Sequence, residues 1–155
     1  MTTRFDFRSG RPLSLDHLAH GRLWLGLGAV LVASVVVGSL VRASDAPGFL
    51  MVNDKVTHLC AYATLMAWFA QLFRHDLTRL LLAVGFVALG LAMELLQGMV
   101  PSRQGDVFDM LANTSGVLLA WSLSYTRFGE LLPTLERTLL RTRDAARGRP
   151  EGRSG

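Results

Sequence analysis

The sequence predicts an all-α protein, an integral membrane bundle of four transmembrane helices followed by a C-terminal amphipathic helix. Half of its 155 residues are hydrophobic. Of its 16 basic and 12 acidic residues, six lie in 1–22 and eleven in 126–155, which leaves eleven for the 103 residues between them. The apolar runs of this middle region show no alternation with a period of two, so they indicate helices rather than strands.

Four apolar runs are each about long enough to cross a hydrocarbon layer of about 30 Å at about 1.5 Å per residue. The predicted spans are 23–41, with no charged residue; 56–73, with only His58 as an ionisable group near neutral pH; 80–102, with only Glu94; and 107–126, with only Asp109. Because lipid requires each backbone amide to be satisfied within its own segment, these runs predict a helical domain over 23–126.

The first span has an alternative interpretation as a cleaved signal sequence. Arginines precede it, and Val41-Arg42-Ala43 faintly resembles a cleavage motif. However, 19 apolar residues exceed the usual signal core of about 7–15, and Arg42 does not suit the cleavage motif. We therefore expect this run to remain as a span.

The basic residues are distributed unequally between alternate segments of the chain. With the N-terminus inside, the inner segments hold 13 of them: four in 1–22, two after the second span and seven in 127–155. The outer loops hold three, Arg42, Lys55 and Arg103. The positive-inside rule therefore predicts that both termini are cytoplasmic.

The C-terminal region opens with a basic amphipathic pattern over 128–146. Its leucines and arginines are spaced as in a helix that lies on an anionic membrane surface, although a solvated chain is an alternative. The Arg- and Gly-rich residues 147–155 are predicted to be a disordered tail. Because the positive charge gathers at the two ends without an aromatic-interleaved basic groove, we expect no nucleic-acid partner.

Polar residues within or beside the spans gather at the outward ends. They are Asp54, Lys55 and His58 at the second span, Glu94 and Gln97 at the third, and Arg103, Asp106, Asp109 and Asn113 at the fourth. Most spacings within each set are three, four or seven residues, which places the set on one helix face. Because a carboxylate that faces lipid is costly, we expect the three faces to meet in one polar layer within about 10 Å of the outer boundary.

Simpler structural roles exist for several of these residues. Asn53 or Asp54 can cap the second helix, and the long side chain of Lys55 can reach the membrane surface by itself. His58 can be a hydrogen-bonded packing residue, and the whole cluster can serve only to lock the helices together. Glu94 and Asp109 favour a functional site, because ionisable residues inside a membrane span are expensive to keep.

Three short motifs follow one another along the chain. They read Asp54-Lys55-Val56-Thr57-His58, then Met93-Glu94-Leu95-Leu96-Gln97, then RQGDVFDMLANTSG over residues 103–116. The pattern D-K-x-x-H, E-x-x-Q, R-x-x-D-x-x-D-x-x-A-N-x-x-G resembles that of the VanZ-like family of small bacterial membrane proteins, over about residues 20 to 125. The resemblance implies a multi-pass protein of the bacterial inner membrane. It also implies a connection with tolerance to teicoplanin-type glycopeptides, which act on cell-wall precursors at the outer face of the membrane.

Two classes of function fit the predicted layer. In the first, a membrane enzyme uses an acid/base or metal site on the head group of an envelope lipid. The catalytic candidates are Asp54, His58, Glu94, Asp106 and Asp109, and the candidate ligands of Zn²⁺ or Mn²⁺ are His58, Glu94 and Asp109. In the second, the layer binds an envelope lipid or cell-wall precursor without catalysis, and the contact residues are Lys55, Gln97, Arg103 and Asn113. We favour binding, because the sequence contains no recognised catalytic triad or zinc spacing; it assigns neither a cofactor nor an oligomeric state.

Overall fold

The structure, a computed structural model, describes residues 13, 15–40, 54–99 and 106–147. This part of the chain is all-α, as predicted. Its helices are α1 (Gly21–Leu40), α2 (Asp54–Leu72), α3 (Asp76–Gly98), α4 (Val107–Leu123) and α5 (Leu131–Arg147), with a short 3₁₀ helix, η3 (Arg127–Glu130), before α5. Arg42, Asn53, Arg103 and the predicted tail beyond residue 147 lie outside the described residues.

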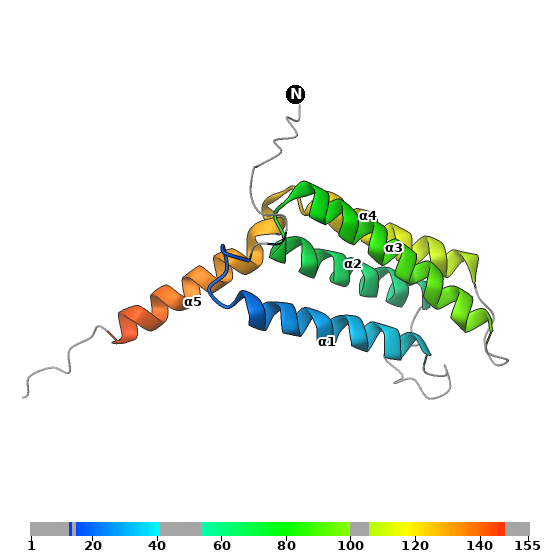
Figure 1. Ribbon diagram of the computed structural model, residues 1–155, viewed down its shortest axis with the longest axis horizontal. Helices are drawn as coiled ribbons and strands as arrows, with labels where there is room; N and C mark the ends of the chain where they lie inside the picture. Colours follow the sequence, from blue (N-terminus) through cyan, green and yellow to red (C-terminus); the bar gives the residue numbers. More distant parts are fainter. Residues whose placement is uncertain (1–12, 14, 41–53, 100–105, 148–155) are drawn as a thin grey trace, which may run out of the picture.

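Helices α1 to α4 lie side by side with alternating directions (Figure 1). Helix α2 contacts each of the other three and packs most extensively on α4. The main core consists of Tyr62, Leu65, Met66, Ala70, Ala83, Phe86, Val117 and Ala120. The start of α2, the end of α3 and the start of α4 therefore meet at one end of the bundle.

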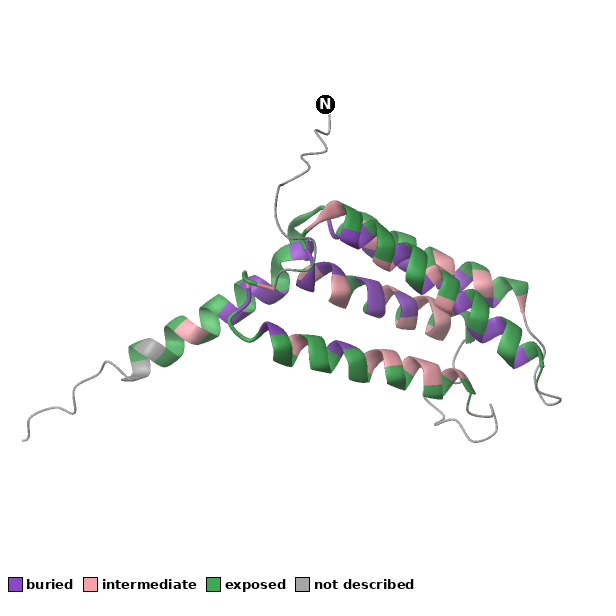
Figure 2. Ribbon diagram, in the orientation of Figure 1, coloured by how far each residue is buried: buried purple, intermediate pink, exposed green. Residues whose placement is uncertain are grey.

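Large apolar side chains remain exposed on the outside of the bundle, on α1, α3 and α4 alike, and Figure 2 shows exposed residues along α1 and α3. The exposed residues of these two helices include Leu23, Leu25, Leu27, Val30, Val37, Leu40, Leu77, Leu80, Leu81, Val84, Leu91, Leu95 and Leu96. Both helices are long and apolar enough to cross a membrane, whereas α4, with 17 residues, is a shorter apolar helix. The described residues thus contain two candidate membrane-spanning helices.

Helix α3 begins at Asp76, four residues before the start of the predicted third span. An acidic residue in the first turn interacts favourably with the positive end of the helix dipole. Arg79, one of the two basic residues between the second and third predicted spans, lies in this helix with only 8% of its surface exposed. Its guanidinium donates hydrogen bonds to the backbone oxygens of Ala70, Phe73 and Ser124 at 2.9–3.2 Å. Polar contacts rather than hydropathy therefore set this helix boundary.

The predicted helix over 128–146 is divided into η3 and α5, and α5 extends away from the bundle (Figure 1). Pro133 lies in the first turn of α5, where its missing N–H removes no intrahelical hydrogen bond. Leu132 packs against Leu18 and Leu72 at the end of the bundle. The side chains of Leu135 and Leu139 remain exposed.

Glu136 joins α5 to the start of α1. Its carboxylate is 5% exposed and accepts hydrogen bonds from the backbone amides of Ala19 and His20, both at 2.9 Å, and from Trp24 Nε1 at 3.1 Å. His20 Nδ1 lies a further 3.1 Å from Glu136 Oε1. Burial alone would raise the pKa of Glu136, but these hydrogen bonds outweigh it and hold the pKa below its usual value.

This lowered pKa predicts a pH-dependent contribution to stability. A carboxyl with a depressed folded pKa stabilises the protein above its usual pKa of about 4.5, and that contribution is lost as the pH falls through the folded value. We expect Glu136→Gln to lower the melting temperature at pH 7, and the gap from the wild type to close below about pH 4. Glu130→Gln is the control, because Glu130 is exposed. A gap that is constant with pH would contradict this role of the ionised group.

Candidate functional site

Six of the residues singled out in the sequence come together at the end of the bundle opposite α5. Asp54, Lys55 and His58 come from the first turns of α2, Glu94 comes from the last turns of α3, and Asp109 and Asn113 come from the first turns of α4. Asp106, the N-cap residue of α4, adjoins them. The alternating helix directions bring these segments together. We call these seven residues the polar cluster.

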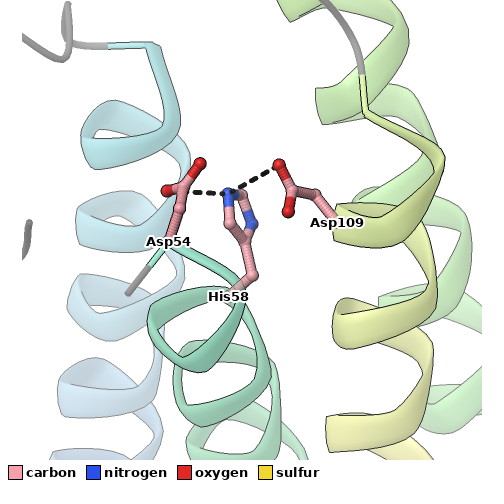
Figure 3. Close-up of side chains that lie close together, drawn as sticks. All are labelled: Asp54, His58 and Asp109. Carbon is pink, nitrogen blue, oxygen red and sulfur yellow. Dashed lines mark ion pairs between the residues drawn. The ribbon is translucent and has the colours of Figure 1, made fainter. Parts of the chain in front are cut away.

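The imidazole of His58 contacts members of the polar cluster on both of its sides, and Figure 3 shows it between Asp54 and Asp109. Its Nε2 is 3.6 Å from Asp54 Oδ1 and 4.0 Å from Asp109 Oδ2. Its Nδ1 is 3.1 Å from Asn113 Oδ1 and 3.7 Å from Glu94 Oε1. Each ring nitrogen therefore faces two oxygen atoms, and the ring connects α2 with both α3 and α4.

Lys55 joins α2 to the start of α4. Its ammonium is 2.6 Å from Asp106 Oδ2 and 3.1 Å from Asp109 Oδ1. The other oxygen of Asp106 accepts a hydrogen bond from the Phe108 amide at 2.8 Å, which caps α4. The hydrogen bond from Lys55, assisted by the one from Phe108, lowers the pKa of Asp106 below its usual value. Lys55 thus holds Asp109 so that its Oδ2 faces His58.

Glu94 is the most deeply buried carboxylate of the polar cluster, with 1% of its surface exposed. Its Oε2 accepts a long hydrogen bond of 3.4 Å from the Asp106 amide. Its Oε1 has no hydrogen-bond partner among the described residues, and neither does Asn113 Nδ2. A buried carboxylate without a strong donor is energetically unfavourable, so this residue is held there by the surrounding fold or by a ligand.

Tyr62 is a neighbour of the polar cluster that was not among the predicted site residues. It is 1% exposed, and its hydroxyl has no hydrogen-bond partner within the described part of the chain. Its ring and the Asn113 side chain both border Gly90, where a Cβ atom would meet each of them within 3.3 Å. The signal was present in the sequence, because Tyr62 lies four residues after His58 and therefore on the same face of its helix.

One of the predicted contact residues, Gln97, makes its hydrogen bond outside the polar cluster. The Gln97 amide donates a 2.6 Å hydrogen bond to the backbone oxygen of Ser39, so Gln97 connects α3 with α1. Arg103 lies outside the described residues. Of the predicted metal ligands, His58 and Asp109 converge, but the third converging ligand atom belongs to Asp54 rather than to Glu94. Glu94 approaches the opposite nitrogen of the ring.

The polar cluster carries an excess of negative charge. Four carboxylates, those of Asp54, Glu94, Asp106 and Asp109, surround one ammonium, that of Lys55. With His58 neutral, this amounts to three uncompensated negative charges among the described residues if all four carboxylates are ionised. Such an excess favours uptake of protons or of a cation. Asp54, at 66% side-chain exposure, connects the buried members with the surface.

Comparison with known proteins adds no assignment to this geometry. No family model, curated protein or solved structure matches the chain. The functional argument therefore depends on the residues of the polar cluster and on their place at one end of a bundle with two candidate membrane-spanning helices.

Proposed function

We propose that the chain is a VanZ-like, multi-pass protein of the bacterial inner membrane, with four spans and both termini in the cytoplasm. The many exposed large apolar side chains of α1 and α3 support this proposal, because soluble monomeric proteins rarely expose large apolar surfaces. The inner segments hold 13 basic residues and the outer loops hold three, and this asymmetry supports the orientation.

Helices α2 and α4 are the two further spans of this proposal. Helix α2 needs less apolar surface than α1, because α1, α3 and α4 surround it. Helix α4 has 17 residues, about 25 Å at about 1.5 Å per residue, and its polar first turn extends toward the head groups. The exposed side chains of Leu111, Leu118 and Leu119 suit contact with lipid.

At its outer end this protein binds the head group of a cell-envelope lipid or cell-wall precursor. The observation that carries this function is the convergence of His58, Asp54 and Asp109 at the end of the bundle, with the fully buried Glu94 behind them. Charged groups are expensive to keep inside a membrane span, so their presence there favours a functional site. On the basis of the resemblance to the VanZ-like family, we assign an envelope precursor as the ligand. We expect its binding to affect tolerance to teicoplanin-type glycopeptides.

A membrane enzyme that acts on the same head group is the second candidate. The observation in its favour is the position of His58, whose two ring nitrogens each face a carboxylate. An imidazole between two carboxylates can take a proton on one side and give one on the other, which is the requirement for general acid–base catalysis.

The test measures capture of a photoactivatable polyprenyl diphosphate added outside intact spheroplasts, in a buffer that contains divalent cations. We expect the wild type to be labelled and both Glu94→Gln and Asp109→Asn to lose most of the labelling while still accumulating in the membrane. These isosteric changes remove the charge with little change of shape, so they distinguish a site from a packing element.

Glu130→Gln and Asp76→Asn are the matched controls, because these acids lie at the opposite end of the bundle. Labelling only after membrane disruption would contradict the outward orientation. Full labelling of Glu94→Gln and Asp109→Asn would contradict the binding function, and loss of accumulation would favour a cluster that only locks the helices. Release of phosphate from the probe would support the enzyme.

A further inference from the structure

Three side chains of the polar cluster point their ligand atoms at one common point. His58 Nε2, a carboxylate oxygen of Asp54 and a carboxylate oxygen of Asp109 all lie within 4.8 Å of one another. Figure 3 shows the two carboxylates on either side of the ring nitrogen. One imidazole and two carboxylates form a donor set that suits Zn²⁺ or Mn²⁺.

Asn113 orients the imidazole for this role. Its Oδ1 lies 3.1 Å from His58 Nδ1 and acts as the acceptor, so the ring proton sits on Nδ1. The lone pair of the neutral ring is then on Nε2, which faces Asp54 and Asp109. Metal-binding histidines usually donate their other N–H in this way, and this contact fixes the tautomer and the ring plane.

Glu94 supplies an independent reason for a cation. It is 1% exposed, its Oε1 has no hydrogen-bond partner among the described residues, and this atom lies 3.7 Å from the imidazole. Lys55, the basic side chain beside the site, is already held by Asp106 and Asp109. A divalent ion beside the ring would compensate most of the remaining negative charge.

The distances leave room for an ion with little rearrangement. Tetrahedral coordination with bonds of about 2.0–2.1 Å places ligand atoms about 3.3 Å apart. The observed separations from His58 Nε2 are 3.6 and 4.0 Å, and the carboxylate oxygens of Asp54 and Asp109 lie within 4.8 Å of each other, so closure requires movements of at most about 1.5 Å. Asp54 can supply this movement, because it lies in the exposed first turn of α2.

We propose that Asp54, His58 and Asp109 bind one Zn²⁺ or Mn²⁺ ion, with Asn113 as the residue that positions the imidazole. Three protein ligands leave one coordination position of a tetrahedral ion open. Resting on the proposed function, we assign this position to a phosphate oxygen of the bound head group. The positive charge of the ion would thus allow an anionic ligand to bind at an acidic site.

The first experiment uses the full chain in detergent, stripped with a chelator and titrated with Zn²⁺ or Mn²⁺ alone in equilibrium dialysis. We expect one ion per wild-type chain and an affinity about tenfold to a hundredfold weaker in Asp54→Asn, Asp109→Asn and Asn113→Ala. Asp76→Asn is the matched control, because Asp76 holds the equivalent first-turn place in α3. A wild type without a stoichiometric ion, or equal affinities in all variants, would overturn the metal site.

A second variant tests the site by gain of a signal. In a Cys60→Ala background, Asp54→Cys should give a thiolate-to-cobalt absorption band with Co²⁺, whereas Asp76→Cys should give none. The same band from both variants, or none from Asp54→Cys with its helical circular dichroism intact, would overturn the proposal.

The role of the ion in holding the phosphate can be tested separately from metal binding. Chelator should abolish capture of the diphosphate probe if the ion holds the phosphate, and capture that persists would overturn this role. Because the dialysis contains no lipid, its result does not depend on whether the proposed head-group binding is correct.

Discussion

Arg79→Met is expected to lower the free energy of unfolding by about 3 kcal/mol or more, although no carboxylate is within ion-pair distance of Arg79 among the described residues. The guanidinium of Arg79 donates to three backbone oxygens at the C-terminal ends of α2 and α4. Carbonyl groups in the last turn of a helix have no intrahelical partner and carry the negative end of the dipole. Methionine fills the space but leaves these buried acceptors unpaired.

Arg79→Lys separates charge from geometry in this contact. Lysine keeps the positive charge, but its compact ammonium cannot reproduce the planar fork that reaches Ala70, Phe73 and Ser124 together. We therefore expect an intermediate loss. The measurement is thermal or detergent-induced unfolding of the purified chain, followed by tryptophan fluorescence.

The matched control is Arg74→Met, in the loop between α2 and α3. Arg74 is 3.4 Å from Glu130, and the two side chains are 35% and 65% exposed. Exposed ion pairs contribute about 0–1 kcal/mol, so this change should be nearly neutral. Equal effects of Arg74→Met and Arg79→Met would show that Arg79 does not tie the two helix ends together.

Hydropathy was sufficient to predict the helices but not all of their ends. The second predicted span, 56–73, corresponds to α2 within two residues, because a long apolar run leaves the backbone few alternatives. The start of α3 was missed because its first turn contains charged residues, among them Arg79, whose hydrogen-bond partners are backbone oxygens at the ends of α2 and α4. The sequence does not reveal which backbone groups a side chain will meet in three dimensions.

The polar cluster was predictable as a layer but not as a set of contacts. Periodicity placed Asp54 and His58 on one face, and the structure has them 3.6 Å apart. It also placed Gln97 with Glu94, yet Gln97 contacts α1. The spacing of residues identifies the side chains that share one face of a helix. Which neighbouring helix this face contacts depends on how the helices are rotated and how they cross. That rotation also decides that Asp54, not Glu94, shares Nε2 of His58 with Asp109.

Gly116→Ala is expected to destabilise the bundle by about 2 kcal/mol or more, although alanine is the better helix former. A Cβ atom at Gly116 would overlap the Leu59 carbonyl oxygen and lie 3.0 Å from the Ala63 nitrogen, which are rigid backbone atoms of α2. Helices α2 and α4 must then move apart at their closest contact. Small residues at such crossings allow helices in a membrane to pack closely.

Gly85→Ala is the control for this change. A Cβ atom at Gly85 meets nothing within 4 Å, so alanine should add about 0.5–1 kcal/mol of stability through its helix propensity. The two substitutions add the same methyl group, but their effects are expected to have opposite signs. Unfolding of the two purified variants in one detergent measures this difference.

Gly116→Ala should also weaken metal binding, because Gly116 shares one face of α4 with Asn113 and Asp109, three and seven residues before it. Any movement of α4 away from α2 carries the carboxylate of Asp109 away from His58, which lies on α2. The separation of 4.0 Å between His58 Nε2 and Asp109 Oδ2 is already longer than the 3.6 Å between His58 Nε2 and Asp54 Oδ1. Destabilisation with unchanged affinity would show that Lys55 and Asn113 hold the site without this helix contact. Loss of both stability and metal affinity would show that Gly116 positions α2 and α4, which carry the ligands of the site.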